Sequence, residues 1–338
     1  MKRMRRFPLQ IAAACCITAA FVVLFHRSAF RLKRMEREGS MSVSTVQRAP
    51  RCRLPPGMKV WSHRAKAGRA HDFGLNCRDT LRALLNAGVR SFDVDVLRVV
   101  EGEKRSLVLS HPLEAAARFL GEGSTEYSAC AFIPMAAFVS MLDELSGYSS
   151  CKKACSRDEA TCKVERCKRD WDVAFELKSR WEGDEDVRLF EEPEWMMAEF
   201  KRQAATLELS TDHCGVHLFD HHFAENDERM QLLDAISEHC LKYFPLRDRD
   251  GPLRPEMLPQ ALSGVIWPSV KLVHTPDGVK RRHAVLPDQD IVVWVVDDAE
   301  MLNLAVKASA TGVVSNEPLH LIDVVRRGDW CGDEPEDQ

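Results

Sequence analysis

The stretch Ser91–Val96 reads Ser-Phe-Asp-Val-Asp-Val, and the fold can be worked out from it. Because successive side chains of a strand point to opposite faces, Asp93 and Asp95 share one face and the apolar residues around them share the other. Two like-charged carboxylates this close repel each other unless a cation lies between them or one takes up a proton. Oxygen ligands of this kind favour Mg²⁺ or Ca²⁺. Taken alone, the Asp-x-Asp pair is equally compatible with an exposed strand edge.

On both sides of this stretch, short apolar runs alternate with helical patterns from about residue 58 onward, which is typical of an α/β fold. The predicted strands are Lys59–Ser62, Ser91–Leu97, Leu107–Ser110, Val173–Lys178, Gly215–Phe219, Gly264–Trp267, Ile291–Val296 and Gly312–Ser315. The predicted helices are Cys77–Ala87, Met135–Leu145, Pro193–Leu207, Glu228–Tyr243 and Ala299–Ser309. Such units fit an open doubly wound sheet or a closed (β/α)8 barrel. No Gly-rich phosphate loop follows the first strand, which argues against a dinucleotide-binding sheet.

A second charged strand is expected at Asp172–Lys178, where Glu176 and Lys178 share one face and apolar residues occupy the other. An edge strand with a salt bridge would show the same pattern. In a barrel, however, the same pattern directs both charged side chains into the open C-terminal end of the barrel. Glu176 would then be a third metal ligand, and Lys178 would be a cation for a phosphate oxygen.

Two histidines directly follow predicted strands: His63 comes after Lys59–Ser62, and His111 comes after Leu107–Ser110. A single histidine at such a position is more often structural than catalytic. Two of them, with carboxylates on the strand between, favour catalysis, because histidine transfers protons near neutral pH. The active sites of barrels gather at the C-terminal ends of strands, where these residues fall.

Together these motifs resemble the glycerophosphodiester phosphodiesterases. The matching segments are His63-Arg64, Leu75-Asn76, Gly88–Val96 and Ser110-His111 near the start, and Val293–Asp297 and Thr311–Pro318 near the end. The related spider-venom sphingomyelinase D enzymes match as well. Those enzymes also have a disulfide-bearing loop after the second histidine, where Cys130 and Cys151–Cys167 lie in this chain. The resemblance covers roughly residues 59–326 and is thinnest between about residues 180 and 285.

The resemblance implies a (β/α)8 TIM barrel with one divalent cation, Mg²⁺ or Ca²⁺. It also implies hydrolysis of phosphoric diesters, either glycerophosphodiesters or (lyso)phospholipids. The roles that it implies are an acid–base or nucleophilic pair in His63 and His111, metal ligands in Asp93, Asp95 and Glu176, phosphate-binding cations in Arg64 and Lys178, and a pocket wall in Trp294. In the venom-type enzymes the attacking group can be the substrate's own hydroxyl, which yields a cyclic phosphate.

The chain departs from the family pattern at three positions. The family usually has Glu at the position of Asp93, which is one methylene shorter. Its Gly after the His-Arg pair is Ala65 here, and the residue after the second histidine, usually Asp or Gly, is Pro112. The first change bears on metal affinity and the last on the direction in which His111 points.

The N-terminus is expected to hold a membrane anchor. The stretch from Phe7 to Phe25 has no charged residue and is long enough to span a bilayer as a helix. A cleaved signal peptide is the alternative, but its apolar core is usually shorter and ends at a small-residue cleavage site. We therefore predict a cytosolic tail and transmembrane helix in residues 1–37, a linker in residues 38–57, the barrel in residues 58–330 and an acidic tail in residues 331–338.

Cysteine usage indicates where the barrel lies. Cys151, Cys155, Cys162 and Cys167 cluster within a polar stretch, the predicted Cys-rich loop at residues 151–167. Their spacing differs from the paired Cys-x-x-Cys of zinc ribbons, so we expect two local disulfides instead of free thiols or a zinc site. Disulfides form in oxidising compartments. We therefore predict a single-pass membrane protein with its body in the secretory lumen or outside the cell.

Other features have simpler interpretations. His213, His217, His221 and His222 together suggest a metal cluster, but a polar loop is the simpler reading, with a substrate role for His217 or His221 as the alternative. Asp297–Glu300 fits the N-cap and first turn of a helix. The net charge of −4 and the dispersed basic residues give no reason to expect nucleic acid. We expect a monomer.

Two rival functions remain open at this stage. A short cytosolic tail, an anchor, a stem and an Asp-x-Asp motif are also typical of Golgi-type glycosyltransferases, whose carboxylates hold Mn²⁺ on a nucleotide sugar. That interpretation leaves His63, His111 and the segment Trp294–Pro318 unexplained. The second rival is a barrel that has lost its activity and kept a lipid-binding role, which the changes at Asp93 and Pro112 would explain.

Overall fold

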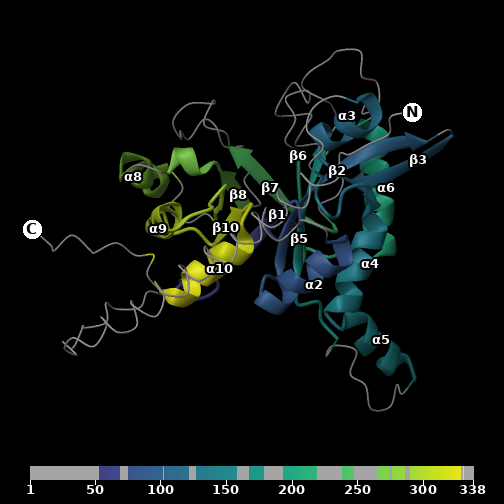
Figure 1. Ribbon diagram of the computed structural model, residues 1–338, viewed down its shortest axis with the longest axis horizontal. Coiled ribbons are helices and arrows are strands. Elements are labelled where there is room, and N and C mark those ends of the chain that lie inside the picture. The colour runs from purple at the N-terminus through teal and green to yellow at the C-terminus, as the bar shows by residue number, and fades with distance from the viewer. Residues whose placement is uncertain are drawn as a thin grey trace, which may run out of the picture. The chain divides into compact units, whose positions relative to one another are not determined.

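The computed structural model of the chain describes residues 53–68, 75–101, 103–121, 127–157, 167–178, 193–218, 238–246, 265–273, 276–285, 290–328 and 330 (Figure 1). The predicted anchor in residues 1–37, most of the linker and the acidic tail lie outside these ranges, so those predictions stay untested. Within the described ranges, no helix combines the length and the apolar character needed to cross a membrane.

The described strands form a TIM-barrel-like sheet. Its parallel strands are β1 (Lys59–His63), β2 (Ser91–Glu101), β5 (Asp172–Lys178), β6 (Cys214–Leu218), β7 (Leu241–Leu246), β8 (Val265–Pro268), β9 (Val292–Trp294) and β10 (Gly312–Ser315). They pair in the order β8-β7-β6-β5-β2-β1-β10-β9. Isolated parallel bridges, Ile266 to Ile291 and Ser269 to Trp294, then join β8 to β9 and bring the two ends of the sheet together. The predicted barrel architecture is thus supported at this level.

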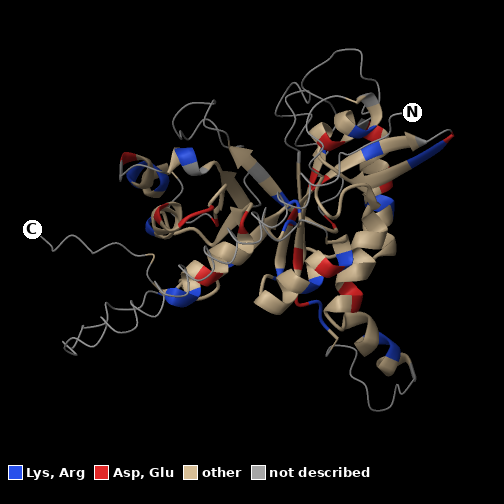
Figure 2. Cartoon of the chain, viewed as in Figure 1, with Lys and Arg blue, Asp and Glu red and all other residues tan. Residues whose placement is uncertain are grey.

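Helices connect these strands. They are α2 (Cys77–Ala87), α3 (Pro112–Leu120), α4 (Met135–Leu145), α5 (Tyr148–Arg157), α6 (Pro193–Thr206), α8 (Pro276–Val285), α9 (Ala299–Lys307) and α10 (Pro318–Arg327), with a 3₁₀ turn, η5, at Val270–Leu272. The bounds predicted for α2 and α4 are confirmed, and those of α6 and α9 differ by one or two residues at the C-terminus. Acidic and basic residues are interspersed along α2 and α10 (Figure 2), as expected for solvent-facing helices.

Two sequence predictions need correction. The strand expected at Leu107–Ser110 belongs to β3 (Lys104–Leu109), which pairs antiparallel with β2 and with the short β4 (Ile133–Pro134), and is not a barrel strand. The helix expected over Glu228–Tyr243 is wrong at its described end, because Leu241–Leu246 forms barrel strand β7. Parallel pairing with β6 and β8 and burial of the aromatic residue at 243 decide the structure there.

The barrel has an inner and an outer core. Phe92, Val94 and Val96 on β2 pack in the large outer core between the sheet and the helices. The inner core is smaller, and aromatic side chains dominate it: Trp61 lies against the rings of Tyr243 and Trp267, at centroid distances of 6.1 Å and 5.2 Å. The alternation predicted for β2 is therefore confirmed, and its polar face looks into the barrel.

Three disulfides join described cysteines: Cys77–Cys130, Cys151–Cys167 and Cys214–Cys240. One of them lies in the predicted Cys-rich region, whose first part is helix α5 and not loop. Cys162 lies outside the described residues, so the second predicted local bond stays untested. The bond from Cys77 to Cys130 ties the start of α2 to the segment that precedes β4.

Candidate active site

One pocket, with a volume of about 130 Å³, is lined by all the residues that were predicted from the sequence to form the site. The predicted residues that line it are His63, Arg64, Asp93, Asp95, His111, Glu176, Lys178 and Trp294. The pocket opens where β1, β5 and β9 end, which is the end of a barrel at which active sites form. Its lining also includes His217, for which a polar loop was the favoured interpretation.

Strand register explains why residues so far apart in sequence meet. On neighbouring strands, His63 is opposite Asp93, and Asp95 is opposite Glu176. Glu176 is in turn opposite His217 on β6. Since opposite residues of paired strands point to the same face, the barrel gathers these side chains in its interior.

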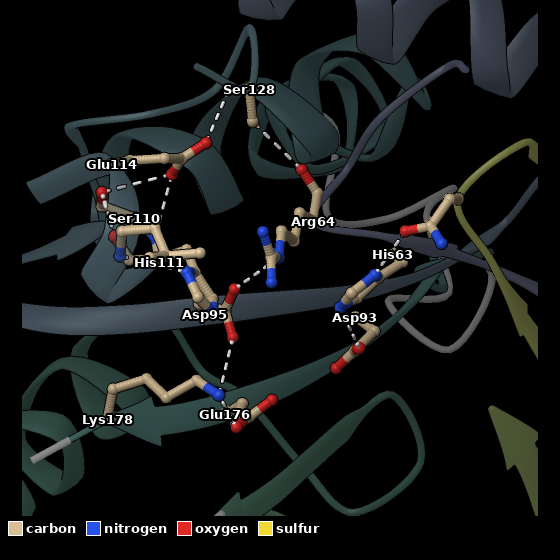
Figure 3. Close-up of polar contacts among 12 residues, drawn as sticks. His63, Arg64, Asp93, Asp95, Ser110, His111, Glu114, Ser128, Glu176 and Lys178 are labelled. Carbon is tan, nitrogen blue, oxygen red and sulfur yellow. Dashed lines mark hydrogen bonds and ion pairs between the residues drawn. The ribbon is translucent and has the colours of Figure 1, made fainter. Parts of the chain in front are cut away.

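Asp95 is held between two cations (Figure 3). Its Oδ2 lies 3.0 Å from Nε of Arg64, and its Oδ1 lies 3.4 Å from Nζ of Lys178. Burial alone would raise the pKa of Asp95. The charges of Lys178 and Arg64 outweigh burial and bring the pKa well below its usual range. Asp95 is therefore a fully charged partner that fixes both cations at the pocket.

Glu176 lies beside the same lysine, but its pKa changes in the direction opposite to that of Asp95. Burial raises the pKa of Glu176 to about 7 despite the opposing charge of Lys178, and the charge of Asp95 adds to the increase. Burial lowers the pKa of Lys178, but Glu176 and Asp95 raise it to a value above its ordinary one. The local cations therefore do not fully balance the buried carboxylates, and a further positive charge would stabilise them.

Asp93 lies near two imidazoles. Its Oδ1 is 3.1 Å from Nε2 of His217, and its Oδ2 is 3.9 Å from Nε2 of His63. Asp93, Glu176 and His217 are all buried, and each offers a ligand atom within 4.8 Å of the others. The polar-loop interpretation of His217 is wrong, because this residue is 2% exposed and lies on strand β6.

Hydrogen bonds determine the tautomer of His63. Asp297 accepts hydrogen bonds from the backbone N–H and the side-chain Nδ2 of Asn316, at 2.7 Å and 3.0 Å. The amide oxygen of Asn316 therefore faces Nδ1 of His63, 2.7 Å away. Because an amide oxygen only accepts, Nδ1 carries the proton and Nε2 of neutral His63 presents a lone pair to the pocket. Burial lowers the pKa of His63, which favours this neutral form.

In His111 the ring nitrogens have the reverse roles, with Nδ1 as the acceptor. It is the N-cap of α3, and its Nδ1 accepts a hydrogen bond from the backbone N–H of Leu113 at 3.1 Å. In the neutral form the proton therefore lies on Nε2. Burial lowers the pKa of His111 to about 3, against the opposing charge of Asp95. Pro112, the departure that bore on the direction of His111, occupies the first turn of α3, where proline is well suited.

Glu114 and Ser128, which the sequence did not single out, hold this corner of the site. Glu114 completes a capping box: its Oε2 accepts the backbone N–H of His111 at 2.9 Å, and its Oε1 accepts that of Ser128 at 2.6 Å. The hydroxyl of Ser128 then donates to the carbonyl of Arg64 at 3.1 Å. One buried carboxylate thus links the segment that carries His111 to the segment that carries Arg64. The spacing of His111 and Glu114, three residues apart before a helix, was the sequence signal for this capping box.

Trp294 and Trp267 both line the pocket. The indole Nε1 of Trp294 donates to the backbone carbonyl of Trp267 at 2.8 Å. The ring of His217 stacks on the ring of Trp267, with centroids 5.3 Å apart and planes 15° apart. The pocket lining therefore combines aromatic rings with charged side chains.

A divalent cation fits the donor atoms of this site. Two buried carboxylates and an imidazole lie within ligand distance of one another, and burial, which raises the pKa of Glu176, disfavours its charged form unless a further positive charge is bound. Asp93 and Glu176 belong both to the predicted ligand set and to this observed cluster. The predicted third ligand, Asp95, is instead paired with Arg64 and Lys178.

The start of helix α9 and His213 lie outside the pocket lining. Asp298 is the N-cap of α9, and its side chain accepts the backbone N–H of Met301 at 2.8 Å, as the helix-start interpretation requires. His213 lies far from the pocket chemistry, in contact with Arg169. His221 and His222 lie outside the described residues.

The chain matches no protein-family model and no curated protein. Among solved structures it is similar to a glycerophosphodiester phosphodiesterase from Parabacteroides distasonis, with 15% identity and a TM-score of 0.53 over 81% of this chain and 98% of that chain. A provisionally assigned glycerophosphodiester phosphodiesterase from Galdieria sulphuraria gives 14% identity and a TM-score of 0.52 over 80% of this chain and 98% of that chain. This chain therefore has a TIM-barrel-like fold that is similar to that of glycerophosphodiester phosphodiesterases, as its sequence motifs predicted.

Proposed function

We propose that this chain is a metal-dependent phosphoric diester hydrolase. The observation that carries the proposal is the pair of pocket histidines with opposite proton positions, placed around buried carboxylates and two cations. Diester cleavage needs one group that attacks or activates the attacker and another that supplies a proton to the leaving oxygen. Nε2 of His63 offers the lone pair for the first role, and Nε2–H of His111 serves the second.

Arg64 and Lys178 would bind the phosphoryl oxygens. Both are held by Asp95, so their charges are fixed before substrate arrives and need no reorganisation as negative charge develops. The phosphodiester carries one negative charge, which would enter a site whose cations already face the pocket. This supports a phosphate-containing substrate over a neutral one.

In the proposed reaction, His63 uses the Nε2 lone pair to attack phosphorus or to activate the attacking hydroxyl. His111 acts as the acid once substrate is bound: its Nδ1 takes up a proton and gives up the hydrogen bond from Leu113, and the imidazolium then transfers Nε2–H to the leaving oxygen as the P–O bond breaks and returns to the neutral ring. The free pocket keeps His111 neutral, with a pKa of about 3. An incoming anionic diester raises that pKa, because the negative charge stabilises the imidazolium.

Asp93 and Glu176 would hold the divalent cation beside these groups. When bound, such a cation neutralises charge on the phosphoryl oxygens. Asp93 is shorter than the glutamate of the family pattern, but it lies in strand β2 with its carboxylate directed at the interior. Its position therefore supports a retained metal site.

The substrate is proposed to be a glycerophosphodiester or a (lyso)phospholipid. Exposed apolar side chains in the segment that follows His111 support the lipid: Leu113 lies in the first turn of α3, Phe119 in its last turn, and Tyr127 beyond the helix. Tyr127 and Phe119 both contact the ring of Phe132, with centroids 5.8 Å apart in each case. An acyl chain would find apolar contacts there. A substrate with a hydroxyl next to the phosphate would yield a cyclic phosphate instead of a hydrolysed product.

The proposed location is a single-pass membrane protein with its barrel in the secretory lumen or outside the cell. Three disulfides among the described cysteines support an oxidising compartment. The anchor itself is proposed from the apolar stretch Phe7–Phe25.

The test is hydrolysis of bis(p-nitrophenyl) phosphate, glycerophosphocholine and lysophosphatidylcholine by the purified chain. We expect turnover that EDTA abolishes and that added divalent cation restores. We expect His63→Ala and His111→Ala each to lower kcat by roughly 10²- to 10⁴-fold, the usual range for a lost acid or base. His320→Ala, an exposed position on α10, is the matched control and should leave kcat unchanged.

The same experiment separates the rival functions. Turnover that persists in EDTA would contradict metal dependence. An absence of turnover with every substrate and cation would favour the inactive, lipid-binding barrel. UDP-sugar binding without diester turnover would favour the glycosyltransferase. Full activity of either histidine variant would refute the role assigned to that residue.

A further inference from the structure

The buried cluster Asp93, Glu176 and His217 carries an inference about the metal itself. We infer that His217 is a nitrogen ligand of the site cation, in place of Asp95, and that the site therefore prefers a borderline transition-metal ion such as Zn²⁺ or Co²⁺ to Mg²⁺ or Ca²⁺. This inference rests on the proposed function, since it concerns the same pocket. It names a ligand set that differs from the one the sequence motifs implied.

Distances within the cluster suit a shared ion. Nε2 of His217 and Oδ1 of Asp93 lie 3.1 Å apart, and ligand atoms from all three residues lie within 4.8 Å of one another. Two ligands at about 2.1 Å from one metal and at right angles to each other are separated by about 3.0 Å. The same distance also fits a plain His–Asp hydrogen bond, so the position of Glu176 is what distinguishes this cluster from a simple pair.

Asp95 has little capacity left for a metal. Its two carboxylate oxygens face Arg64 and Lys178 at 3.0 Å and 3.4 Å. Moving Asp95 onto a metal would remove the shared partner of two partly buried cations, of which Lys178 would still pair with Glu176. Side-chain exposure is 4% for Asp95 and 12% for Lys178, so water would not compensate well for that loss. Asp95 is thus the counter-ion of the phosphate-binding cations.

His217 is held in place for ligation. Its ring stacks on Trp267, and Gly215, two residues earlier on the same face of β6, leaves room for the neighbouring ring of Tyr243. Among the described residues its Nδ1 has no hydrogen-bond partner, so the contact with Asp93 is its only polar one there. A buried imidazole with this little hydrogen bonding gains most from a bound cation.

The donor atoms decide the class of cation. Mg²⁺ and Ca²⁺ prefer oxygen ligands, and Mg²⁺ demands near-ideal octahedral geometry. Imidazole nitrogen suits Zn²⁺, Co²⁺ and neighbouring ions, whose affinity for mixed nitrogen and oxygen sites is generally higher. Two carboxylates and one imidazole therefore shift the preference away from the alkaline-earth ions that the Asp-x-Asp motif alone predicts.

The first test needs no variant and no substrate. The full chain, purified without reductant and stripped of metal, is loaded with Mn²⁺ as a paramagnetic probe, and electron spin-echo envelope modulation is recorded. We expect modulation from a directly bound ¹⁴N nucleus. Bound Mn²⁺ without nitrogen modulation would overturn the inference. Titration calorimetry on the same sample should show Zn²⁺ binding at least about tenfold more tightly than Mg²⁺.

Two variants identify the nitrogen and test the role of Asp95. His217→Ala should remove the ¹⁴N modulation and weaken Zn²⁺ binding at least about tenfold. Asp95→Asn, the matched variant on β2, should keep the modulation and change metal affinity far less. If Asp95→Asn abolishes metal binding and His217→Ala does not, the sequence-derived ligand set is correct and the inference fails. Far-ultraviolet circular dichroism of each variant verifies that it is folded.

These results are independent of catalysis. A nitrogen-bound cation in a chain that hydrolyses no diester would leave the inference standing and remove the proposed function. Diester turnover supported by a cation with oxygen ligands alone would do the reverse. Neither result depends on the choice of substrate, because metal binding is measured in its absence.

Discussion

At the scale of single residues, the hydrogen bond that each Nδ1 makes distinguishes the two pocket histidines. The proton of His63 points to Asn316, which Asp297 orients in turn. Nδ1 of His111 accepts from a helix backbone N–H. Two chemically identical side chains thus acquire opposite roles from partners that touch no substrate.

This assignment predicts the effect of Asn316→Ala. The variant removes the acceptor for Nδ1–H of His63, so the ring loses its fixed tautomer and orientation. We expect kcat for bis(p-nitrophenyl) phosphate to fall about 10- to 100-fold, as for other lost partners of functional imidazoles. KM should change by less than about twofold, because no substrate contact is removed. Steady-state kinetics over a range of pH measure both values.

Asp298→Ala is the control for this variant, since Asp298 caps helix α9 and is not among the described residues that line the pocket. It should lower stability by about 1 kcal/mol and leave kcat unchanged. An Asn316→Ala enzyme with unchanged kcat and a raised KM would show that Asn316 binds substrate and does not position His63.

Much of the site could be predicted from sequence because its residues carry chemical signatures. Asp-x-Asp, Glu-x-Lys and the two strand-end histidines all line the pocket. The sequence offered a polar loop or a substrate role for His217 and not a metal-ligand role, because the run Gly215–Phe219 has no second polar residue on the inward face. His217 belongs to the site because it is opposite Glu176 on the neighbouring strand. The strand register that places it there depends on the pairing of the whole sheet.

At the scale of elements, strands β6 and β7 depend on a glycine. A Cβ atom at Gly215 would lie 2.0 Å from the ring of Tyr243, and 3.0 Å is already closer than packed atoms normally approach. Tyr243 is 6% exposed and packs against Trp61 and Trp267 in the inner core. The small residue on one strand therefore makes the large one on the next strand possible.

We expect Gly215→Ala to destabilise the fold by about 1–3 kcal/mol, the usual cost of overpacking a core. The urea midpoint, followed by tryptophan fluorescence, measures this loss. In a Tyr243→Val background, which removes the ring, the same substitution should cost much less. Equal costs in both backgrounds would show that the clash with Tyr243 is not the cause.

Elements with strong local signals were predicted, and those without them were not. Helices α2 and α4 have apolar positions at helical spacing and matched their predicted bounds. Strand β7 reads as the end of a helical pattern, and pairing with β6 and β8 overrides that local preference. Helix α5 was missed because its sequence is polar and rich in cysteine, and it packs on α4.

At the scale of the whole molecule, the strand ends opposite the pocket are tied together by one arginine. Arg169 makes a two-pronged ion pair with Asp143 of α4, with both N–O distances at 2.8 Å, and donates to the carbonyls of Leu207 and Glu208 at the end of α6. It also donates to Nε2 of His213, 3.0 Å away, just before β6. Because an arginine only donates, His213 must present a lone pair there and stay neutral.

This arrangement gives the barrel a pH-dependent stability that can be isolated at His213. Burial lowers the pKa of His213 below its unfolded value of 6.5, and the charge of Arg169 lowers it further. The folded chain therefore holds fewer protons than the unfolded chain just below pH 6.5. The contribution of neutral His213 is fully present above that pH and is lost as the pH falls toward the lowered pKa.

We expect His213→Gln to remove this dependence. Urea midpoints of both chains are compared between pH 7.5 and 5 in EDTA, so that metal release does not contribute. The stability of the original chain should fall relative to that of the variant as the pH drops below about 6.5. Glu176, whose pKa is raised to about 7, acts in the opposite sense, but its contribution is common to both chains and cancels in the difference. A difference that stays constant across this range would contradict the neutral state assigned to His213. A difference that grows as the pH falls would show that protonation of this one imidazole works against the Arg169 contacts that join α4, α6 and the start of β6.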